Sequence, residues 1–538
     1  MGRGTGRIAV SRPILITSGA YVGEEMQAEF GRIPPAFLPV GPTYLVRHQL
    51  ARLPGDADVT LSLPHDFDLE AAQARFLDEA GVRVVRIDPR KSLGMSVFQS
   101  VLEMGMGPGI EIVHGDTLVD APATCTHDGV SIERVSEQYR WGTVETDGDR
   151  VTALHSDALR GGDSDEARIL SGYFAIGDTQ GFLKCLSRSD FRFVKALHLY
   201  AQDRDVAARE DIAALDFGHL KTYYSSRHDL ASARHFNALE IDDYTVTKRS
   251  EQTEKIDAEA NWLATVPASL QPFTARMVRH YGEAPSGQYE THYAHFPSLA
   301  ELSLARPPRI VWRKILESCR EFLERAAQET RDEDSGLVWL GIDKLRERLR
   351  DYPETMPRRD APLTINGQSV GTLETIYEGV RARIEDASER PASIMHGDFC
   401  FSNILFDPRA DRIMLIDPRG LVRGKATLFG DARYDIAKLG HSIVGRYDQI
   451  MAGQLVATRS DLGAFELVVD DNDRRDWLER EFLGMRAAGV AFDDPVVGAL
   501  MVSLFLSMVP LHGDDPERQQ TLFANALRLV AAQAADAR

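Results

Sequence analysis

At 538 residues the chain is too long for one hydrophobic core, and roughly two to four domains are expected. Its 43% hydrophobic and 27% charged residues are typical of a soluble globular protein. The formal net charge of −19 repels phosphate backbones and anionic lipid, so nucleic-acid or membrane-surface binding is disfavoured as the main function.

The cysteines and the apolar segments indicate the compartment. The four cysteines lie far apart without a C-x-x-C pair, which argues against a structural zinc site or a disulfide framework and suits a reducing cytosol. The N-terminus lacks the apolar core of a signal peptide. The stretch VVGALMVSLFLSMVP is shorter than the ~20 residues needed to cross a bilayer, and it is interpreted as a buried helix. We therefore expect a cytoplasmic protein with no membrane span and no nucleic-acid partner, and a homo-oligomer stays open.

Through about residue 230, short apolar runs alternate with helical segments. The runs PILITSG, DVTLSLP, VRVVRID and IEIVHGD predict buried strands, and EAAQARFLDEAG and MSVFQSVLEMG predict the helices between them. This alternation is typical of an α/β fold with a mostly parallel sheet that is flanked by helices.

Several segments of this region resemble sugar nucleotidyltransferases. The segments FGRIPPAFLPVGPTYLVRHQL, IVHGDTLVD, WGTVETDGDRV, ILSGYFAI and LDFGHLKTYYSSR follow the order of that family's landmarks. The resemblance implies a nucleotidyltransferase-like domain over residues 1–230, in which Asp116 and Asp216 would be metal ligands.

The triphosphate-binding part of that region departs from the family. Glu24 and Glu25 lie where a glycine-rich loop with an arginine is usual, and Pro35 replaces a lysine. Acidic side chains and a proline cannot supply the positive charge and amide donors that a triphosphate needs. We expect a domain that binds a nucleotide sugar or only supports the rest of the chain, and the two retained aspartates keep an active domain open as the alternative.

From about residue 236 the pattern changes. The segment FNALEIDDYTVTKRS predicts strands with a turn at Asp242 and Asp243, and EKIDAEANWLATVP predicts a helix that ends before a proline. Beyond residue 310 helical periodicity dominates, with RDEDSGLVWLG and DYPETMPRRDAPLTINGQ as loop-like interruptions.

The segment IMHGDFCFSNILFDPRADRIMLIDPRG predicts a β-hairpin. Two apolar runs flank the polar turn PRADR, so the returning strand brings Asp417 near Asn403, and Asp398 begins the loop that leads in. Phosphoryl transfer needs a carboxylate for the acceptor hydroxyl and oxygen ligands for Mg²⁺ on the phosphates. The pattern D-x-x-x-x-N, followed later by an Asp at the end of a strand, supplies these groups. The alternative is a surface hairpin whose Asp and Asn only form turns.

HGDFCFSN together with IDPRG resembles the aminoglycoside phosphotransferase and choline kinase group, which has an α+β protein-kinase-like fold. The resemblance implies a small lobe over residues 231–308 and a large lobe over residues 309–538. It also implies that Asp398 is the catalytic base and that Asn403 and Asp417 hold the metal.

The same resemblance implies an ATP site. Lys248, in TVTKRS, matches the strand lysine that contacts the phosphates, and Glu259, on the predicted helix, matches its partner. GQYETHYAHFPSLAEL resembles the hinge, where backbone groups around Glu290 to Tyr293 would meet adenine.

The order of the two domains resembles that of two-domain proteins of bacterial capsule and surface-polysaccharide biosynthesis. We expect an ATP- and Mg²⁺-dependent kinase that phosphorylates a hydroxyl of a sugar, polyol or amino alcohol. The alternatives are a bifunctional kinase and nucleotidyltransferase, and a non-catalytic nucleotide-binding scaffold. Asp431 and Asp435, in GDARYDIAKLGHSI, either brace a helix or touch the substrate. An acidic pocket would favour an amino sugar or amino alcohol, and an Arg-rich pocket an anionic sugar.

Overall fold

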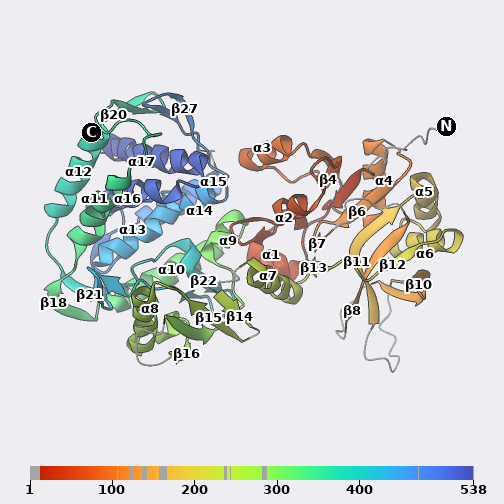
Figure 1. Ribbon diagram of the computed structural model, residues 1–538, viewed down its shortest axis with the longest axis horizontal. Coiled ribbons are helices and arrows are strands. Elements are labelled where there is room, and N and C mark those ends of the chain that lie inside the picture. Colours follow the sequence, from red (N-terminus) through yellow and green to blue (C-terminus); the bar gives the residue numbers. More distant parts are fainter. Residues whose placement is uncertain are drawn as a thin grey trace, which may run out of the picture. The chain divides into compact units, whose positions relative to one another are not determined.

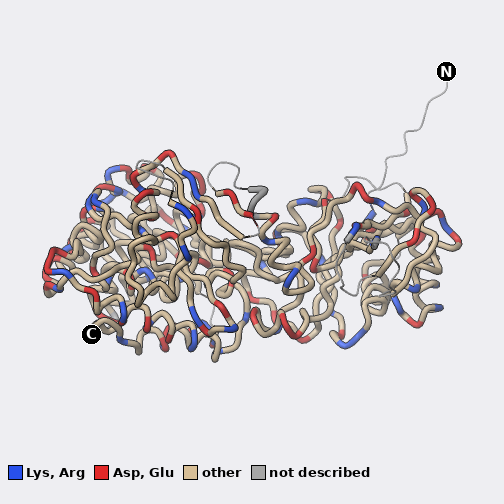
Figure 2. The backbone as a smooth tube through the Cα atoms, turned by 90° about the horizontal axis from the view of Figure 1, so that it is seen from below, with Lys and Arg blue, Asp and Glu red and all other residues tan. Residues whose placement is uncertain are grey.

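The computed structural model of the protein describes residues 12–105, 107–120, 127–135, 142–156, 167–234, 239–242, 244–280, 287–469 and 472–536. Its internal contacts divide the chain into two compact units, Met1–Arg227 and His228–Arg538. Figure 2 shows Lys and Arg interspersed with Asp and Glu along the backbone of both units.

A nine-stranded sheet forms the centre of the first unit, in the order β5-β4-β1-β6-β11-β8-β12-β10-β9 (Figure 1). In that order the strands are Arg83–Ile87, Val59–Pro64, Ile14–Thr17, Ile110–His114, Ala167–Ile176, Gly129–Val135, Ala207–Arg209, Arg150–His155 and Thr143–Asp147. The first four pair in parallel, because the helices α3 (Ala71–Glu79) and α4 (Leu93–Met104) provide the crossovers between β4, β5 and β6. The α/β prediction is confirmed.

The other half of the sheet is mainly antiparallel, whereas the sequence predicted a mostly parallel sheet. β11 runs antiparallel to both β6 and β8, and β9 returns directly into β10. The turn between β9 and β10 contains Gly148 with φ 58°, a left-handed conformation that glycine adopts at little cost. A turn this tight can join only antiparallel strands.

The core of the first unit lies between the sheet and three helices, α4, α5 (Thr179–Arg188) and α6 (Phe193–Asp203). Ile112 and Phe174 of the sheet belong to one buried apolar cluster with Phe182 and Leu197 of the helices. Each of these side chains is removed from water, which is the main stabilising contribution to such a layered fold. The remaining helices of this unit are α1 (Glu24–Phe30), α2 (Leu45–Arg52) and α7 (Leu220–Arg234).

The second unit begins with an antiparallel sheet in the order β14-β15-β17-β16. Its strands are Leu239–Ile241, Thr245–Arg249, Gln288–His292 and Met277–His280, and the helix α8 (Thr253–Thr265) packs on β16 and β17. The predicted turn is present, because the Asp242 carboxylate accepts the backbone N–H groups of Tyr244 and Thr245 at 2.8 and 2.7 Å. Asp243 lies outside the described residues.

The predicted hairpin is also present in the second unit. β22 (Ile404–Asp407) and β23 (Arg412–Leu415) pair antiparallel with Ile404 opposite Leu415. The helix α10 (Arg309–Ala326) packs against β23, and α13 (Ala432–Ile443) follows the hairpin. The remaining helices are α9 (Leu299–Leu304), α11 (Lys344–Arg348), α12 (Leu373–Glu385), α14 (Tyr447–Met451), α15 (Asp473–Leu483), α16 (Pro495–Met508) and α17 (Pro516–Asp536).

The apolar helix α16 is a core element of the second unit. By length and composition alone, the segment Pro495–His512 could cross a membrane, but 61% of it is buried inside the protein. α16 packs against α12, α13 and α17 (Figure 1). A helix that is covered on several sides needs no polar face. This agrees with the interpretation of the segment as a buried helix.

Two segments that looked like loops contain strands. β19 (Leu363–Ile365) and β20 (Gln368–Gly371) form a hairpin whose turn residues Asn366 and Gly367 have φ of 50° and 77°. Asn-Gly favours this kind of turn. β18 (Thr330–Asp334) pairs with β21 (Pro391–Ile394) although all its side chains are exposed, so no apolar alternation reveals it.

Candidate active site

Lys248 and Glu259 form an ion pair in the small sheet. Lys248 Nζ, on β15, lies 2.7 Å from Glu259 Oε2, on α8, and 3.0 Å from Asp417 Oδ1. Tyr289 of β17 donates its hydroxyl to the same Glu259 oxygen at 3.2 Å. Burial lowers the pKa of Lys248, but Asp417 and Glu259 outweigh this effect and raise it, so the ammonium group stays charged. The lysine is thus held in place by Glu259 of α8 and by Asp417 at the end of the hairpin, and Tyr289 of β17 supports Glu259.

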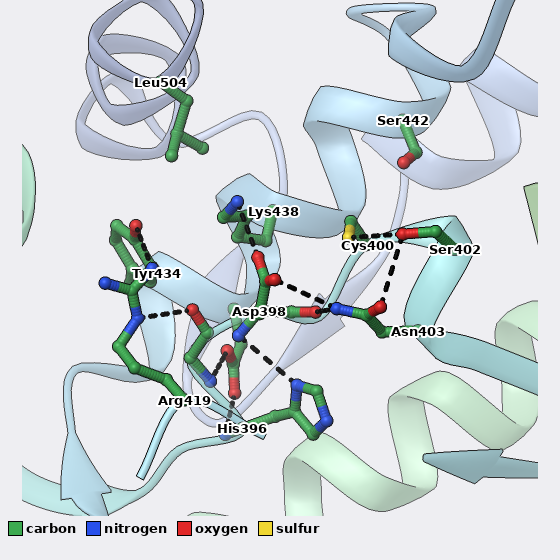
Figure 3. Close-up of polar contacts among 12 residues, drawn as sticks. His396, Asp398, Cys400, Ser402, Asn403, Arg419, Tyr434, Lys438, Ser442 and Leu504 are labelled. Atoms are coloured by element: carbon green, nitrogen blue, oxygen red, sulfur yellow. Dashed lines mark hydrogen bonds and ion pairs between the residues drawn. The ribbon is translucent and has the colours of Figure 1, made fainter. Parts of the chain in front are cut away.

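Asp398 lies between an amide and an ammonium group (Figure 3). Asn403 Nδ2 donates to Asp398 Oδ2 at 3.0 Å, and Lys438 Nζ, from α13, lies 2.7 Å from Asp398 Oδ1. Burial raises the pKa of Asp398, but Lys438 and Arg419 outweigh this effect and hold it below its usual range. The carboxylate is therefore ionised at neutral pH, and its side chain remains 38% exposed.

The loop before Asp398 is held by a buried carboxylate. The backbone N–H groups of His396 and Gly397 each donate to Asp435 at 2.7 Å. Gly397 has φ 78°, and a Cβ there would lie 2.6 Å from the Cβ of Arg419, so glycine is required. Of the two roles left open for Asp435, the structure shows the bracing one. Asp431 likewise caps α13, where it accepts the N–H of Arg433 at 3.0 Å.

Asn403 and Asp417 carry oxygen atoms suited to a hard cation. Because a carboxylate only accepts, the contact with Asp398 orients the Asn403 amide with its nitrogen toward Asp398 and its oxygen away. The N–H of Ile416 donates to the Asn403 carbonyl at 3.0 Å, which continues the hairpin as far as Asp417. Asp417 has φ 55° and an exposed fraction of 42%. Two protein oxygens with phosphate and water oxygens are the usual environment of Mg²⁺ beside a nucleotide, so these residues fit the metal.

The adenine contact expected at Glu290 to Tyr293 stays a prediction, and the structure shows where these two residues lie. Glu290 lies inside β17, between Thr247 of β15 and Arg279 of β16, so its peptide groups face neighbouring strands. The N–H of Tyr293, just after the strand, donates to the Tyr244 carbonyl at 2.8 Å. A role for Tyr293 in nucleotide binding stays a prediction.

The first unit brings Asp116 and Asp216 together. Thr117, at the start of β7 (Thr117–Val119), lies opposite Asp216, at the end of β13 (Ala214–Asp216). A Cβ at Gly218 would lie 2.6 Å from Asp116 Oδ2 and 3.2 Å from Asp216 Oδ1. Asp216 Oδ2 is buried and has no hydrogen-bond partner among the residues that the structure describes, and burial followed by Asp116 raises the pKa of Asp216. The pair fits a divalent cation, and its role as a metal site stays a prediction.

Sequence reasoning missed Lys438, Arg419 and Tyr289. Lys438 comes three residues after Asp435, nearly one helical turn further along α13. This spacing places both residues on the same face of the helix and was the available signal for Lys438. Arg419 Nε donates to the Gly397 carbonyl at 2.9 Å (Figure 3). Tyr289 gave no signal, because its role depends on the packing of β17 against α8.

A family model matches most of the second unit. Residues 231–468 match the model of the phosphotransferase enzyme family. A search of the curated proteins finds no match. The match includes the small sheet, the hairpin and α13, which are the elements that carry the residues just described.

Comparison with solved structures finds likenesses for about the N-terminal 40% of the chain. A UDP-glucose pyrophosphorylase complexed with UDP-glucose is 15% identical, with a TM-score of 0.34, over 42% of this chain and 100% of that chain. A UTP-bound UGPase from Acinetobacter baumannii is 13% identical, with a TM-score of 0.33, over 42% and 94%. A glucose-1-phosphate thymidylyltransferase from Bacillus anthracis is 13% identical, with a TM-score of 0.34, over 42% and 97%.

Proposed function

We propose that this chain, whose residues 231–468 belong to the phosphotransferase enzyme family, is a kinase that transfers the γ-phosphoryl group of ATP to a hydroxyl of a small molecule. One observation carries the proposal. Asp417 joins two groups of residues, because it pairs with Lys248 at 3.0 Å and ends the hairpin that begins at Asn403 and Asp398. A surface hairpin with turn-forming residues would have no reason to meet a half-buried lysine that is paired with a buried glutamate.

The residues divide the reaction between them. Lys248, held by Glu259, contacts the phosphates of the nucleotide. Asp398 accepts a hydrogen bond from the acceptor hydroxyl and orients its oxygen toward the γ-phosphorus. As the new oxygen–phosphorus bond forms and the bond to the β-phosphate oxygen breaks, the hydroxyl proton passes to Asp398. Because Lys438 keeps Asp398 weakly basic, the proton moves late, when the hydroxyl oxygen has already become acidic.

Asn403 and Asp417 would hold Mg²⁺, which in phosphoryl transfer neutralises the charge that develops on the phosphate oxygens. The resemblance in the order of the two units supports placing the product in surface-polysaccharide biosynthesis, and the scattered cysteines support a cytoplasmic location. A second candidate function, that of a bifunctional kinase and nucleotidyltransferase, rests on the convergence of Asp116 and Asp216.

ATP turnover by the purified full chain tests the proposal. We expect ADP release with Mg²⁺ and at least one acceptor from a panel of sugars, polyols and amino alcohols with their charged analogues, and a phosphorylated product by mass spectrometry. Asp398→Asn should fold normally and lose ~10²–10⁴-fold in rate. Asp407→Asn is the matched control, because Asp407 Oδ1 only accepts backbone N–H groups in the turn, which Asn can also do. Equal turnover by Asp398→Asn and Asp407→Asn would exclude Asp398 as the base.

A further inference from the structure

A cavity lies in the second unit beside the loop from Asp398 to Asn403. It is open on one side, and its empty volume, counting the mouth, is about 430 Å³. Side chains of α9, α10, α13, α14 and α15 line it together with Phe401 of the loop. Elements that are far apart in the sequence thus meet around one space next to the candidate active site.

The inner wall of the cavity is close to the partner of Asp398. The backbone N–H of Phe401, three residues after Asp398, donates to the Ser442 hydroxyl at 3.1 Å, and both residues line the cavity. Ser442 lies four residues after Lys438 on one face of α13, a rise of about 6 Å (Figure 3). Because Lys438 pairs with Asp398 at 2.7 Å, the cavity begins about one helical turn from that pair.

Two buried polar side chains line the cavity with atoms that lack partners. The Arg446 side chain is 5% exposed, and its Nε and Nη1 have no hydrogen-bond partner among the described residues. Asp448 is 8% exposed, and its Oδ2 is likewise unpartnered within that part of the chain. A buried donor or acceptor without a partner is costly. A ligand that supplies the missing partners therefore gains binding free energy here.

The backbone conformation of Arg446 is also unusual. Its φ of 54° lies in the left-handed region, which residues with a side chain rarely adopt. Such conformations persist where surrounding contacts fix them, and they are frequent at functional sites. Here Nη2 pairs with Asp476 and Glu479 at 3.2 and 3.4 Å. These contacts hold one end of the guanidinium and leave Nε and Nη1 open.

The charged groups at the cavity nearly balance, which favours an uncharged ligand. Three arginines face three carboxyl groups, namely Arg446, Arg474 and Arg475 against Asp448, Asp476 and Glu479. Arginine alone would favour an anionic sugar, but the carboxyl groups offset it. The open atoms need both acceptors and a donor. A hydroxyl group both donates and accepts, whereas a carboxylate only accepts.

An aromatic wall completes the cavity. Trp312 of α10 and Phe401 both line it and stack with ring centroids 5.6 Å apart. Such rings offer apolar surface to the C–H groups of a ligand. Aromatic surface with a few placed polar groups is the usual lining of a small-molecule site.

We propose that this cavity binds the phosphoryl acceptor, and that the acceptor is an uncharged sugar or polyol. Its non-reacting hydroxyl groups bond to Arg446 and Asp448, while another hydroxyl meets Asp398. This inference rests on the proposed kinase function and narrows its substrate class. Charged analogues are disfavoured, because an ammonium group would approach Arg446 and a carboxylate gives the Asp448 oxygen no donor.

Arg446→Lys tests the cavity, because it keeps a positive charge beside Asp476 and Glu479 and removes the two open N–H groups. In the full chain with Mg²⁺ and ATP, KM for the acceptor should rise about 10-fold or more, with kcat and KM for ATP near their wild-type values. Arg480→Lys is the matched control, because Arg480 is exposed and donates to the Asp476 carbonyl in its own helix.

Ser303→Leu tests the same cavity without removing a charge. Ser303 is half-buried and lines the cavity, and its hydroxyl donates to the Ala300 carbonyl of its own helix at 2.7 Å. The larger side chain should fill part of the cavity and also raise KM for the acceptor. Thermal melting checks that both variants are folded. An unchanged KM for the acceptor in folded Arg446→Lys and Ser303→Leu would overturn the inference and leave the kinase intact.

Acceptors that differ in charge test the substrate class. For the wild-type chain, kcat/KM is measured for glucose, ribose, inositol and glycerol, and for glucosamine, a glucose phosphate and glucuronate. We expect at least one uncharged compound to exceed every charged one by about 10-fold or more. A charged compound as the best acceptor would contradict the inference.

A binding experiment separates this inference from the kinase proposal. With Mg²⁺ and a non-hydrolysable ATP analogue present, calorimetry measures the binding of the four uncharged compounds to the full chain. Saturable binding that weakens about 10-fold in Arg446→Lys, and not in Arg480→Lys, supports the site. If such binding occurs without turnover, the kinase proposal alone fails. Absence of saturable binding by all four would overturn the inference and leave ordered water as the partner of Arg446 and Asp448.

Discussion

At Asp398, burial and positive charge have opposite effects on one carboxyl group. Burial raises its pKa, and Lys438 and Arg419 lower it by more. Lys438→Met removes the stronger of these cations, so the pKa of Asp398 should rise. Because the reaction needs the ionised form, the acidic limb of the pH profile of kcat/KM should move to higher pH, and the loss of activity should be greatest at acidic pH.

The exposed Lys425 provides the control for this prediction. Lys425→Met should leave the acidic limb of the profile in place. If Lys438→Met lowered activity equally at all pH values, Lys438 would act by packing and not through the charge of Asp398.

Asp417 is the residue on which the metal assignment depends. Asp417→Ala removes a charged oxygen ligand and also one of the two carboxylates that pair with Lys248. We expect Mg²⁺-dependent ATP binding, measured by calorimetry, to weaken by about 10-fold or more. Unchanged nucleotide affinity and unchanged metal dependence would make Asp417 a structural residue.

At the scale of elements, the first turn of α14 contains a carboxyl group whose burial disfavours its ionised form. Asp448 is 8% exposed, its Oδ2 has no hydrogen-bond partner within the described part of the chain, and burial raises its pKa to about 7. The native state therefore binds this proton more tightly than the unfolded state does, and the group contributes a loss of stability as pH rises from about 4 to 7.

Asp448→Asn should remove this pH-dependent loss. The stability of the variant relative to wild type should grow between pH ~4 and pH ~7, by at most about 4 kcal/mol, and stay constant at higher pH. Thermal melting of both proteins at several pH values measures the difference. A difference that does not change with pH would mean that Asp448 is ionised throughout.

Elements with a strong local signal were predicted well. The strands of the parallel half, α3, α4 and the hairpin β22–β23 all combine apolar periodicity with turn or cap residues. β18 was missed because it is charged and exposed, and its pairing with β21 is a tertiary contact. The Asn-Gly dipeptide at residues 366 and 367 is a local signal for a hairpin turn, but this segment was interpreted as a loop.

At the scale of the whole molecule, the first unit retains two carboxylates and lacks the cationic groups expected for a triphosphate. Glu24 and Glu25 open α1, and Pro35 begins a short helical turn. We predict that the full chain releases no pyrophosphate from nucleoside triphosphates with candidate sugar phosphates. Asp116→Ala should leave the kinase rate within a few-fold of wild type. Pyrophosphate release that disappears in Asp116→Ala would make the protein bifunctional and would assign the clamp to other cations, such as Arg32 or Lys91.

The sequence by itself determined the residues that are close along the chain or belong to one motif. Asn403 and Asp417 flank the two strands of one hairpin and Asp398 lies in the loop before it, so their spacing and the turn were enough to predict this arrangement. The pairing of Lys248 with Glu259 followed from a family resemblance, and the structure shows the contact at 2.7 Å.

Only the tertiary structure decided which residues from separate elements surround that hairpin. Tyr289 and Lys438 come from β17 and α13, and their contacts depend on how these elements pack. It also placed Glu290 inside a sheet, where its peptide groups face other strands. Periodicity reports which side of an element is buried but not which neighbour covers it, so the charges around Asp398 became visible only in the folded chain.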